Sequence, residues 1–229
     1  MNWFFSTLTS GVGKKVIMSL TGLFLILFLV IHLAGNLQLL QDDGGKAFNL
    51  YSELMAHNPL IQLVSKANFF FILLHAGISY SLYIKNKRAR PIGYKVSAGS
   101  ANSSWSSRSM SLLGTLIFIF LLVHLKGFWF EFKYGDSVST VVIDGLEMHN
   151  SYLWVAEAYA NPIIAGFYVL SMAVLGFHLW HGFASAFQSL GLNHVKYNGL
   201  ITTAGKLYSL VIPALYAIIP ILLYLKSLS

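Results

Sequence analysis

Five long apolar runs dominate the sequence, at roughly residues 16 to 40, 60 to 84, 109 to 130, 161 to 188 and 205 to 226. A helix needs about 20 apolar residues to span the hydrocarbon core of a membrane, and each run is that long. Composition agrees, because only 10% of the residues are charged, against about 25% in an ordinary soluble domain. We therefore expect an all-α integral membrane bundle of five transmembrane helices, forming a single domain over residues 1–229.

The chain contains no cysteine. Disulfides, thiolate metal sites, iron–sulfur ligands and covalently attached haem are therefore excluded. The first apolar run follows Lys14 and Lys15 and lacks a small-residue cleavage site before the next polar loop. It is also longer than the apolar core of a signal peptide, so we expect it to be retained as a span.

The basic residues predict the orientation of the bundle. With the N-terminus in the cytoplasm, ten of the fifteen lysines and arginines fall on the inner side, namely Lys14, Lys15, Lys85, Lys87, Arg88, Arg90, Lys95, Arg108, Lys196 and Lys206. The positive-inside rule then predicts a cytoplasmic N-terminus and an external C-terminus. Because the net charge of +7 is concentrated beside the spans, anionic lipid or a cytoplasmic protein is the expected partner, and nucleic acid is not.

Four of the runs carry a histidine in their interior, and these are the main candidate site residues: His32, His75, His124 and His178. An ionisable side chain inside a membrane costs roughly 2 kcal/mol or more unless it is compensated. An interhelical hydrogen bond would compensate any one of them. Neutral imidazole is also the commonest metal ligand among side chains, so metal coordination is the alternative.

The depths of these histidines match in pairs. With a helix rise of about 1.5 Å per residue, His32 and His124 both lie ~25 Å from the inner basic boundary. His75 and His178 both lie roughly 15 to 20 Å from it. Two level-matched pairs on four helices predict two centres stacked across the membrane.

Bis-histidine haem b fits such centres best. A porphyrin is flat and apolar, is held between facing helices and takes one axial ligand from each side. A bare metal ion would need further ligands, and the span interiors offer no carboxylate or thiolate. Glycines follow the four histidines by two to four residues and would leave room for a macrocycle or for ordinary helix packing; they are Gly35, Gly77, Gly127 and Gly182.

His181 follows His178 by three residues on nearly the same helix face. It is an alternative axial ligand, although the depth of His178 fits better, and it could instead bond a haem propionate or a quinone. The remaining histidines, His57, His149 and His194, fall in loops or at span edges and are expected to be solvated.

Three segments together resemble a known family. SLTGLFLILFLVIHLAGN, NKRARPIGY and NPIIAGFYVLSMAVLGFHLWHGFASAFQSLGL occur in this order within a five-span layout. They resemble the dihaem cytochrome b558 subunit, the membrane anchor, of bacterial succinate dehydrogenase or of the similar fumarate reductase. The resemblance covers essentially the whole chain.

The resemblance implies that His32 and His124 ligate a distal haem, and that His75 and His178, rather than His181, ligate a proximal one. It implies a flavoprotein subunit and an iron–sulfur subunit on the cytoplasmic side. Electrons from succinate would reach a quinone, usually menaquinone, through two haem b groups in the bacterial cytoplasmic membrane. The dicarboxylate chemistry of this respiratory complex II would lie outside this chain.

A quinone site near the outer haem would need polar groups at the outer ends of the spans. The candidates are Asn36, Gln38, Glu53 and Lys126, with Glu53 as a proton carrier or simply a solvated carboxylate. The sequence SYLWVAEAYANP predicts a short interfacial helix with Trp154 and Tyr159 at headgroup level. The polar, basic segment of residues 86 to 108 is the expected docking surface for the soluble subunits.

Other functions stay open at this point. The same subunit type serves a quinol:fumarate reductase, and other membrane oxidoreductases also carry a haem b anchor. A histidine-based proton or metal transporter and a haem-free anchor belong to different classes. The assembly of the complex into higher oligomers is not fixed by the sequence.

Overall fold

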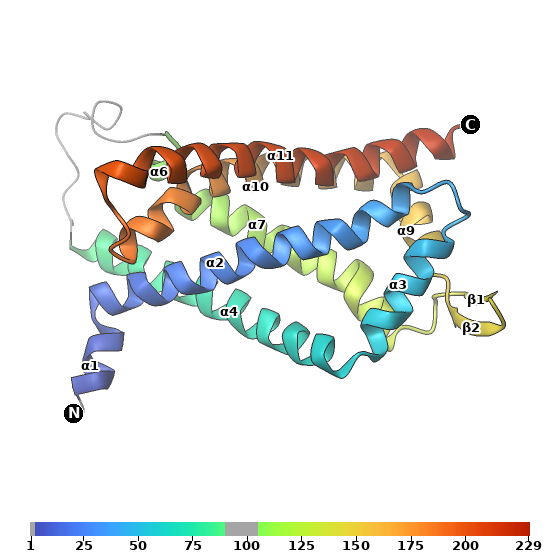
Figure 1. The fold of residues 1–229 in the computed structure, drawn as a ribbon, viewed down its shortest axis with the longest axis horizontal. Helices are drawn as coiled ribbons and strands as arrows, with labels where there is room; N and C mark the ends of the chain where they lie inside the picture. The colour runs from blue at the N-terminus through green and yellow to red at the C-terminus, as the bar shows by residue number, and fades with distance from the viewer. Residues whose placement is uncertain (1–2, 90–104) are drawn as a thin grey trace.

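Five helices of the computed structural model are long and apolar enough to cross a membrane. The structure describes residues 3–89 and 105–229. Figure 1 shows the spans running side by side along the long axis of the molecule. The spans are α2 (Gly11–Asn36, continued by the 3-10 turn η1, Leu37–Leu40), α4 (Pro59–Arg88), α7 (Met110–His124), α10 (Pro162–Ser189) and α11 (Val195–Ser227). The third span continues from α7 through the π-turn η2 (Leu125–Phe130) into α8 (Glu131–Tyr134).

The same dipeptide starts two of the spans. Asn58 and Asn161 cap α4 and α10 by accepting hydrogen bonds from main-chain N–H groups of the first turn, and each is followed by a proline at the first helical position. Asparagine satisfies N–H groups that have no helical partner, and proline has no N–H to leave unpaired there. The Asn-Pro pairs therefore fix where these spans begin.

The five predicted spans are all present, but some ends differ. The fifth span was expected from residue 205, whereas α11 begins at Val195, because residues 195–204 extend the helix beyond its apolar part. His194 caps this extension by accepting from the Lys196 N–H, at 3.2 Å. The predicted interfacial helix is also present, as α9 (Ser151–Ala160). The orientation of the termini across a membrane stays a prediction.

Four spans form a ring. Helix α2 packs against α4, α4 against α7, α7 against α10, and α10 against α2. Helix α11 lies outside this ring, along α10 and also touching α2 (Figure 1). Consequently α2 lies diagonally opposite α7, and α4 lies diagonally opposite α10.

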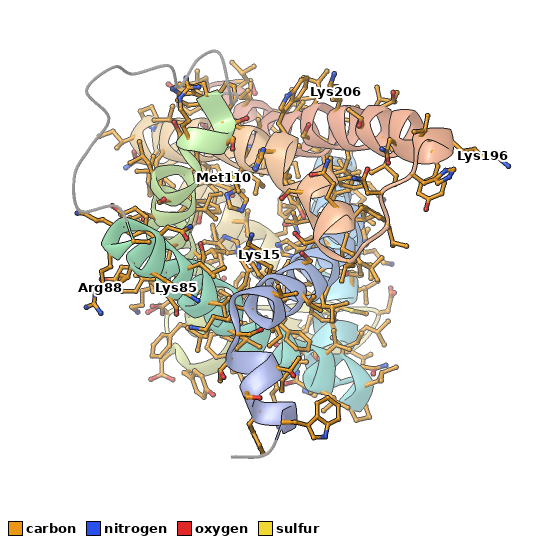
Figure 2. The ribbon with its side chains drawn as sticks, turned by 90° about the vertical axis from the view of Figure 1, so that its left-hand side faces the viewer. Lys15, Lys85, Arg88, Met110, Lys196 and Lys206 are labelled. Atoms are coloured by element: carbon orange, nitrogen blue, oxygen red, sulfur yellow. The ribbon has the colours of Figure 1, made fainter. Side chains whose placement is uncertain are left out.

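The two ends of the bundle differ in charge. We call the left-hand end of Figure 1 the basic end; it holds α1 (Trp3–Thr9), α6 (Trp105–Arg108) and the lysines shown in Figure 2. The opposite, acidic end holds α3 (Lys46–His57), a hairpin of β1 (Thr140–Ile143) and β2 (Leu146–His149), and α9. Most of the expected docking segment, residues 90–104 with Arg90 and Lys95, lies outside the described residues.

Helices α3 and α9 close the acidic end. Asn49 of α3 is almost fully buried, accepts a hydrogen bond from the Tyr152 N–H at 2.8 Å and donates one to Asn150 Oδ1 at 3.1 Å. Beneath them an apolar core joins these helices to the spans; it consists of Leu33, Leu39, Phe48, Val155, Tyr159, Tyr168, Ile219 and Leu223. Tyr159 was expected at headgroup level; its ring is buried in this core, and its depth in a membrane stays a prediction.

The hairpin has a two-residue turn with a clear local cause. Asp144 and Gly145 both have positive φ angles, of 51° and 81°. This is the conformation of the tight hairpin turn that matches the twist of the strands, and Asp-Gly is a preferred sequence for it. The side chain of Lys46 in α3 then pairs with Asp144 at 2.8 Å and ties the hairpin to the bundle.

Candidate functional site

The four span histidines meet as two pairs across the diagonals of the ring. The ring centroids of His32 in α2 and His124 in α7 are 6.0 Å apart. Those of His75 in α4 and His178 in α10 are 6.4 Å apart. We call these the acidic-end pair and the basic-end pair, and they are the two pairs that helix depth predicts.

At the basic-end pair, α2 orients one imidazole. His75 Nδ1 lies 3.2 Å from the main-chain oxygen of Met18 and 3.1 Å from the hydroxyl of Thr21. A carbonyl can only accept, so Nδ1 carries the proton and Nε2 keeps its lone pair. His178 Nδ1, by contrast, is buried without a hydrogen-bond partner among the described residues. Both rings are partly buried.

Glycines of neighbouring helices make room for this pair. A Cβ atom on Gly22 of α2 would lie 3.3 Å from His75 Cε1, and one on Gly114 of α7 would lie 3.8 Å from His178 Cε1. Sequence reasoning missed both, because it considered only glycines that follow a histidine on the same helix. Of those, Gly35 packs against the ring of Tyr51, while Gly77, Gly127 and Gly182 have open space where a Cβ would be.

At the acidic-end pair, aromatic rings line both imidazoles. Phe28 stacks on His32 and Phe120 stacks on His124, each from one helical turn earlier. Such i, i+4 neighbours share a helix face, so the sequence spacing determines these contacts. The hydroxyl oxygen of Tyr168 lies 3.4 Å from His124 Nδ1. The site is therefore apolar around the rings, with single polar contacts at their edges.

The donor set of each pair fits a haem iron. A metal bound between two imidazoles lies about 2 Å from one nitrogen of each ring, and that nitrogen lies about 1 Å from the ring centroid. The two ring centroids are then about 6 Å apart. Both observed separations are close to this value. Among the described residues no group of three histidine, cysteine, aspartate or glutamate side chains converges on one point. Two opposed imidazoles in an apolar setting suit a planar cofactor with two axial ligands.

His181 lies on the turn of α10 that follows His178 and is also partly buried. Within the described part of the chain, the ring that approaches His75 is that of His178. The exposed histidines behave differently: His57 pairs with Glu53 at 3.1 Å, and His194 caps α11. The structure thus separates the paired histidines from the others.

The predicted quinone-site residues are not brought together. Asn36 touches the acidic-end pair, with its side-chain nitrogen 3.3 Å from His32 Nδ1 and donating to the His32 carbonyl at 2.7 Å. Lys126 is largely exposed and pairs with Glu131, and Glu53 pairs with His57. Gln38 is partly buried in η1. Of the four, only Asn36 contacts a paired histidine among the described residues.

A π-turn directly follows His124. In η2 the helix widens, and the main-chain oxygen of Gly127 accepts a hydrogen bond from Trp154 Nε1 of α9 at 2.9 Å. Such π-turns are often found at functional sites. Here the turn links the third span to the helix that closes the acidic end, and no local sequence signal predicts it.

Two tyrosines outside the spans are held neutral at this end. Burial raises the pKa of the Tyr51 phenol above its ordinary value of 10.0. Burial, together with the neighbouring Tyr168, raises the pKa of Tyr159 well above the same value. Burial therefore disfavours the ionised form of both phenols.

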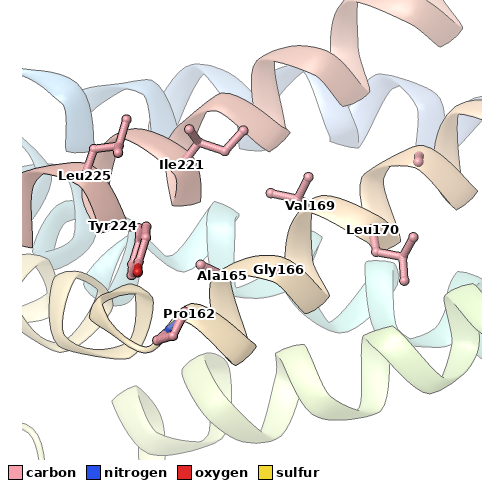
Figure 3. Close-up of a pocket in the computed structure, with 9 residues that line it drawn as sticks. Pro162, Ala165, Gly166, Val169, Leu170, Ile221, Tyr224 and Leu225 are labelled. Carbon is pink, nitrogen blue, oxygen red and sulfur yellow. The ribbon is translucent and has the colours of Figure 1, made fainter.

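One groove lies away from the histidine pairs. It has a volume of about 450 Å³ between α10 and α11 and is lined by residues such as Pro162, Ala165, Ile221 and Tyr224 (Figure 3). Its lining is mainly apolar and includes none of the span histidines. It is not part of the candidate site.

Comparison of the chain with protein-family models, with curated proteins and with solved structures found no match. The candidate site therefore depends on the geometry described above and on the sequence motifs.

Proposed function

We propose that this protein is the membrane-anchoring dihaem cytochrome b subunit of a bacterial succinate:quinone oxidoreductase. In this proposal His32 and His124 hold one haem b, and His75 and His178 hold the other. The observation that carries it is the meeting of four imidazoles as two opposed pairs, with centroids 6.0 and 6.4 Å apart, across the diagonals of one helical ring.

His32 with His124, and His75 with His178, would each hold a haem that supplies one-electron exchange and leaves no position for a substrate. The chain's own residues prepare the sites for it. Met18 and Thr21 hold His75 in the tautomer whose Nε2 can bind a metal. Phe28 and Phe120 cover the faces of His32 and His124, which limits their rotation and excludes water.

The proposed partners are those that the family resemblance implies. A cytoplasmic basic end, as the positive-inside rule favours, would face the flavoprotein and iron–sulfur subunits in the bacterial cytoplasmic membrane. A quinone, which we propose to be menaquinone, would then be reduced at the acidic end. Asn36 is the first candidate for its recognition because it already touches His32; Gln38, Glu53 and Lys126 are weaker ones. The same arrangement would serve a quinol:fumarate reductase.

Haem content is the decisive measurement. The full chain, purified in detergent, is expected to give a reduced-minus-oxidised spectrum of haem b and about two haems per chain in the pyridine haemochrome assay. His57→Ala, at an exposed histidine, is the matched control and should keep both. A chain that binds no haem would contradict the proposal and leave the transporter or the haem-free anchor.

A further inference from the structure

Among the described residues, neither Lys14 nor Lys85 at the basic end has a carboxylate within ion-pair distance. The sequence has no aspartate or glutamate before Asp42, between Glu53 and Glu131, or after Glu157. At the acidic end, by contrast, Lys46, Lys126 and Lys226 each have a carboxylate within ion-pair distance. An anion that binds Lys14 and Lys85 would therefore come from outside the described part of this chain.

Two ammonium groups gather where α2 crosses α4 at this end. Lys14 of α2 donates a hydrogen bond from Nζ to Ser81 Oγ of α4 at 2.6 Å. The Nζ of Lys85 lies over Gly11, where an added Cβ would be 3.5 Å away. Gly11 of α2 thus lies opposite Lys85 of α4, and Lys14 lies opposite Ser81. Both pairs fit one register of two antiparallel helices. The two ammonium groups come from positions about one helical turn, ~5 Å, apart along this crossing.

We expect the crossing to lie at the level of the lipid headgroups. Helix α1 meets α2 at an angle, as Figure 1 shows, and exposes the aromatic side chains of Trp3 and Phe5. Aromatic side chains of such helices sit at the membrane–water interface. Because α1 ends next to Gly11, the Lys14 and Lys85 ammonium groups lie close to that interface. In Figure 2, Lys15 lies near the middle of this end, Lys85 lies to its left and Lys196 lies far to the right.

We propose that Lys14, Ser81 and Lys85 form a binding site for the phosphate group of an anionic phospholipid. Two ammonium groups and a hydroxyl provide the charge and the hydrogen-bond donors that a phosphodiester needs. Lys14 is partly buried between two spans, and both spans expose apolar side chains at this end, among them Val12 and Tyr80. A lipid presents its phosphate together with acyl chains that cover such surfaces.

Two other anions have the same chemistry. Free phosphate lacks the acyl chains. A haem propionate at the basic-end pair would come from deeper in the bundle, because Thr21, beside His75, lies seven residues or about 10 Å along α2 from Lys14. The experiment has to separate these sources from a lipid.

Thermal unfolding of the full chain in nanodiscs provides the test. Phosphatidylglycerol in place of part of the phosphatidylcholine is expected to raise the Tm by a few degrees, since a ligand that binds only the folded state stabilises it. Lys14→Gln combined with Lys85→Gln should lose most of this shift, and arginine at both positions should restore it. Lys196→Gln removes one positive charge at the same end, as Lys85→Gln does, and should keep the full shift. Native mass spectrometry should show fewer retained phosphatidylglycerol molecules on the double variant only.

Lys85→Gln alone guards against a folding defect, because this side chain is exposed and its loss disturbs no packing. Equal shifts in the double variant and Lys196→Gln would overturn the proposal. So would a full shift from inorganic phosphate added to phosphatidylcholine nanodiscs. A double variant that keeps its lipid preference but changes the midpoint potential of bound haem would assign the lysines to a propionate instead.

Discussion

The hydroxyl of Tyr216 in α11 donates a hydrogen bond to the main-chain carbonyl of Leu29 in α2, at 2.7 Å. The ring of the same tyrosine lies 6.0 Å from the ring of His32. Since Leu29 precedes His32 by three residues, Tyr216 holds α2 one turn before a proposed haem ligand and also contacts that ligand. Helix α11 lies outside the ring of four spans, yet it helps to position the acidic-end pair.

Replacing Tyr216 by phenylalanine removes only the hydroxyl. We expect a loss of about 1 kcal/mol in stability, as for an ordinary hydrogen bond, and a shift in the midpoint potential and electron paramagnetic resonance signal of one haem only. Tyr208→Phe is the matched control, because Tyr208 donates to Ile26 of the same helix at 2.6 Å, further from His32. Tyr208→Phe should lower the stability by a similar amount without shifting the midpoint potential or the electron paramagnetic resonance signal of a haem. An identical haem response in both variants would show that Tyr216 has no special role.

Gly22→Ala tests the space beside His75. The new Cβ would lie 3.3 Å from His75 Cε1, closer than most real contacts, so the ring must move. We expect the basic-end haem to be reduced in occupancy or altered in its spectrum, measured by the haemochrome assay and the reduced-minus-oxidised spectrum. Gly77→Ala is the control, because its Cβ would lie in open space. It should stabilise the protein by up to about 1 kcal/mol through the higher helix propensity of alanine. A normal spectrum for Gly22→Ala would mean that the glycine serves helix packing alone.

Asn49→Ala should loosen the acidic end. The change leaves the Tyr152 N–H without its acceptor and removes one of the two hydrogen bonds that Asn150 Oδ1 accepts. Each unsatisfied buried group costs about 1 to 3 kcal/mol. The expected result is a lower Tm and faster hydrogen exchange in α9. Asn193→Ala removes an exposed amide contact instead and should change neither quantity.

The acidic end should also be sensitive to alkaline pH. Burial raises the pKa of Tyr159, so above the ordinary value of about 10 the unfolded chain loses a proton that the folded chain keeps. Stability therefore falls as the pH rises through this window, because the folded state binds more protons there. Unfolding followed from pH about 8 to about 11 should show a smaller fall for Tyr159→Phe than for the wild type. The exposed Tyr134, changed to phenylalanine, should leave the curve as in the wild type.

The spans and the histidine pairs could be predicted because they depend on quantities that one helix determines by itself. Apolar length identifies a span, and a constant rise per residue gives the depth of His32 or His178. Gly22, Gly114 and Tyr216 could not be found in this way, because their roles depend on which helix faces are neighbours. The π-turn after His124 and the inward position of Tyr159 likewise result from packing between α7, α9 and α10. Local sequence does not encode these contacts.

The assignment of ligands to haems is tested by single substitutions. Since His32 and His124 form one pair, His32→Ala and His124→Ala should remove the same spectral component and leave the other haem in place. His75→Ala and His178→Ala should both remove the second component. The two components are expected to differ in midpoint potential and in their electron paramagnetic resonance signals, which allows each to be followed separately.

His181→Ala supplies the sharpest control for this assignment. Its imidazole lies one turn from His178, on the same helix and at similar distance from the basic end, but the ring that faces His75 is that of His178. The variant should therefore keep two haems per chain, with at most a shift in the potential of one of them. If His181→Ala lost a haem while His178→Ala kept both, α10 would contribute the other histidine, and the geometry of the basic-end pair would have to change when haem binds.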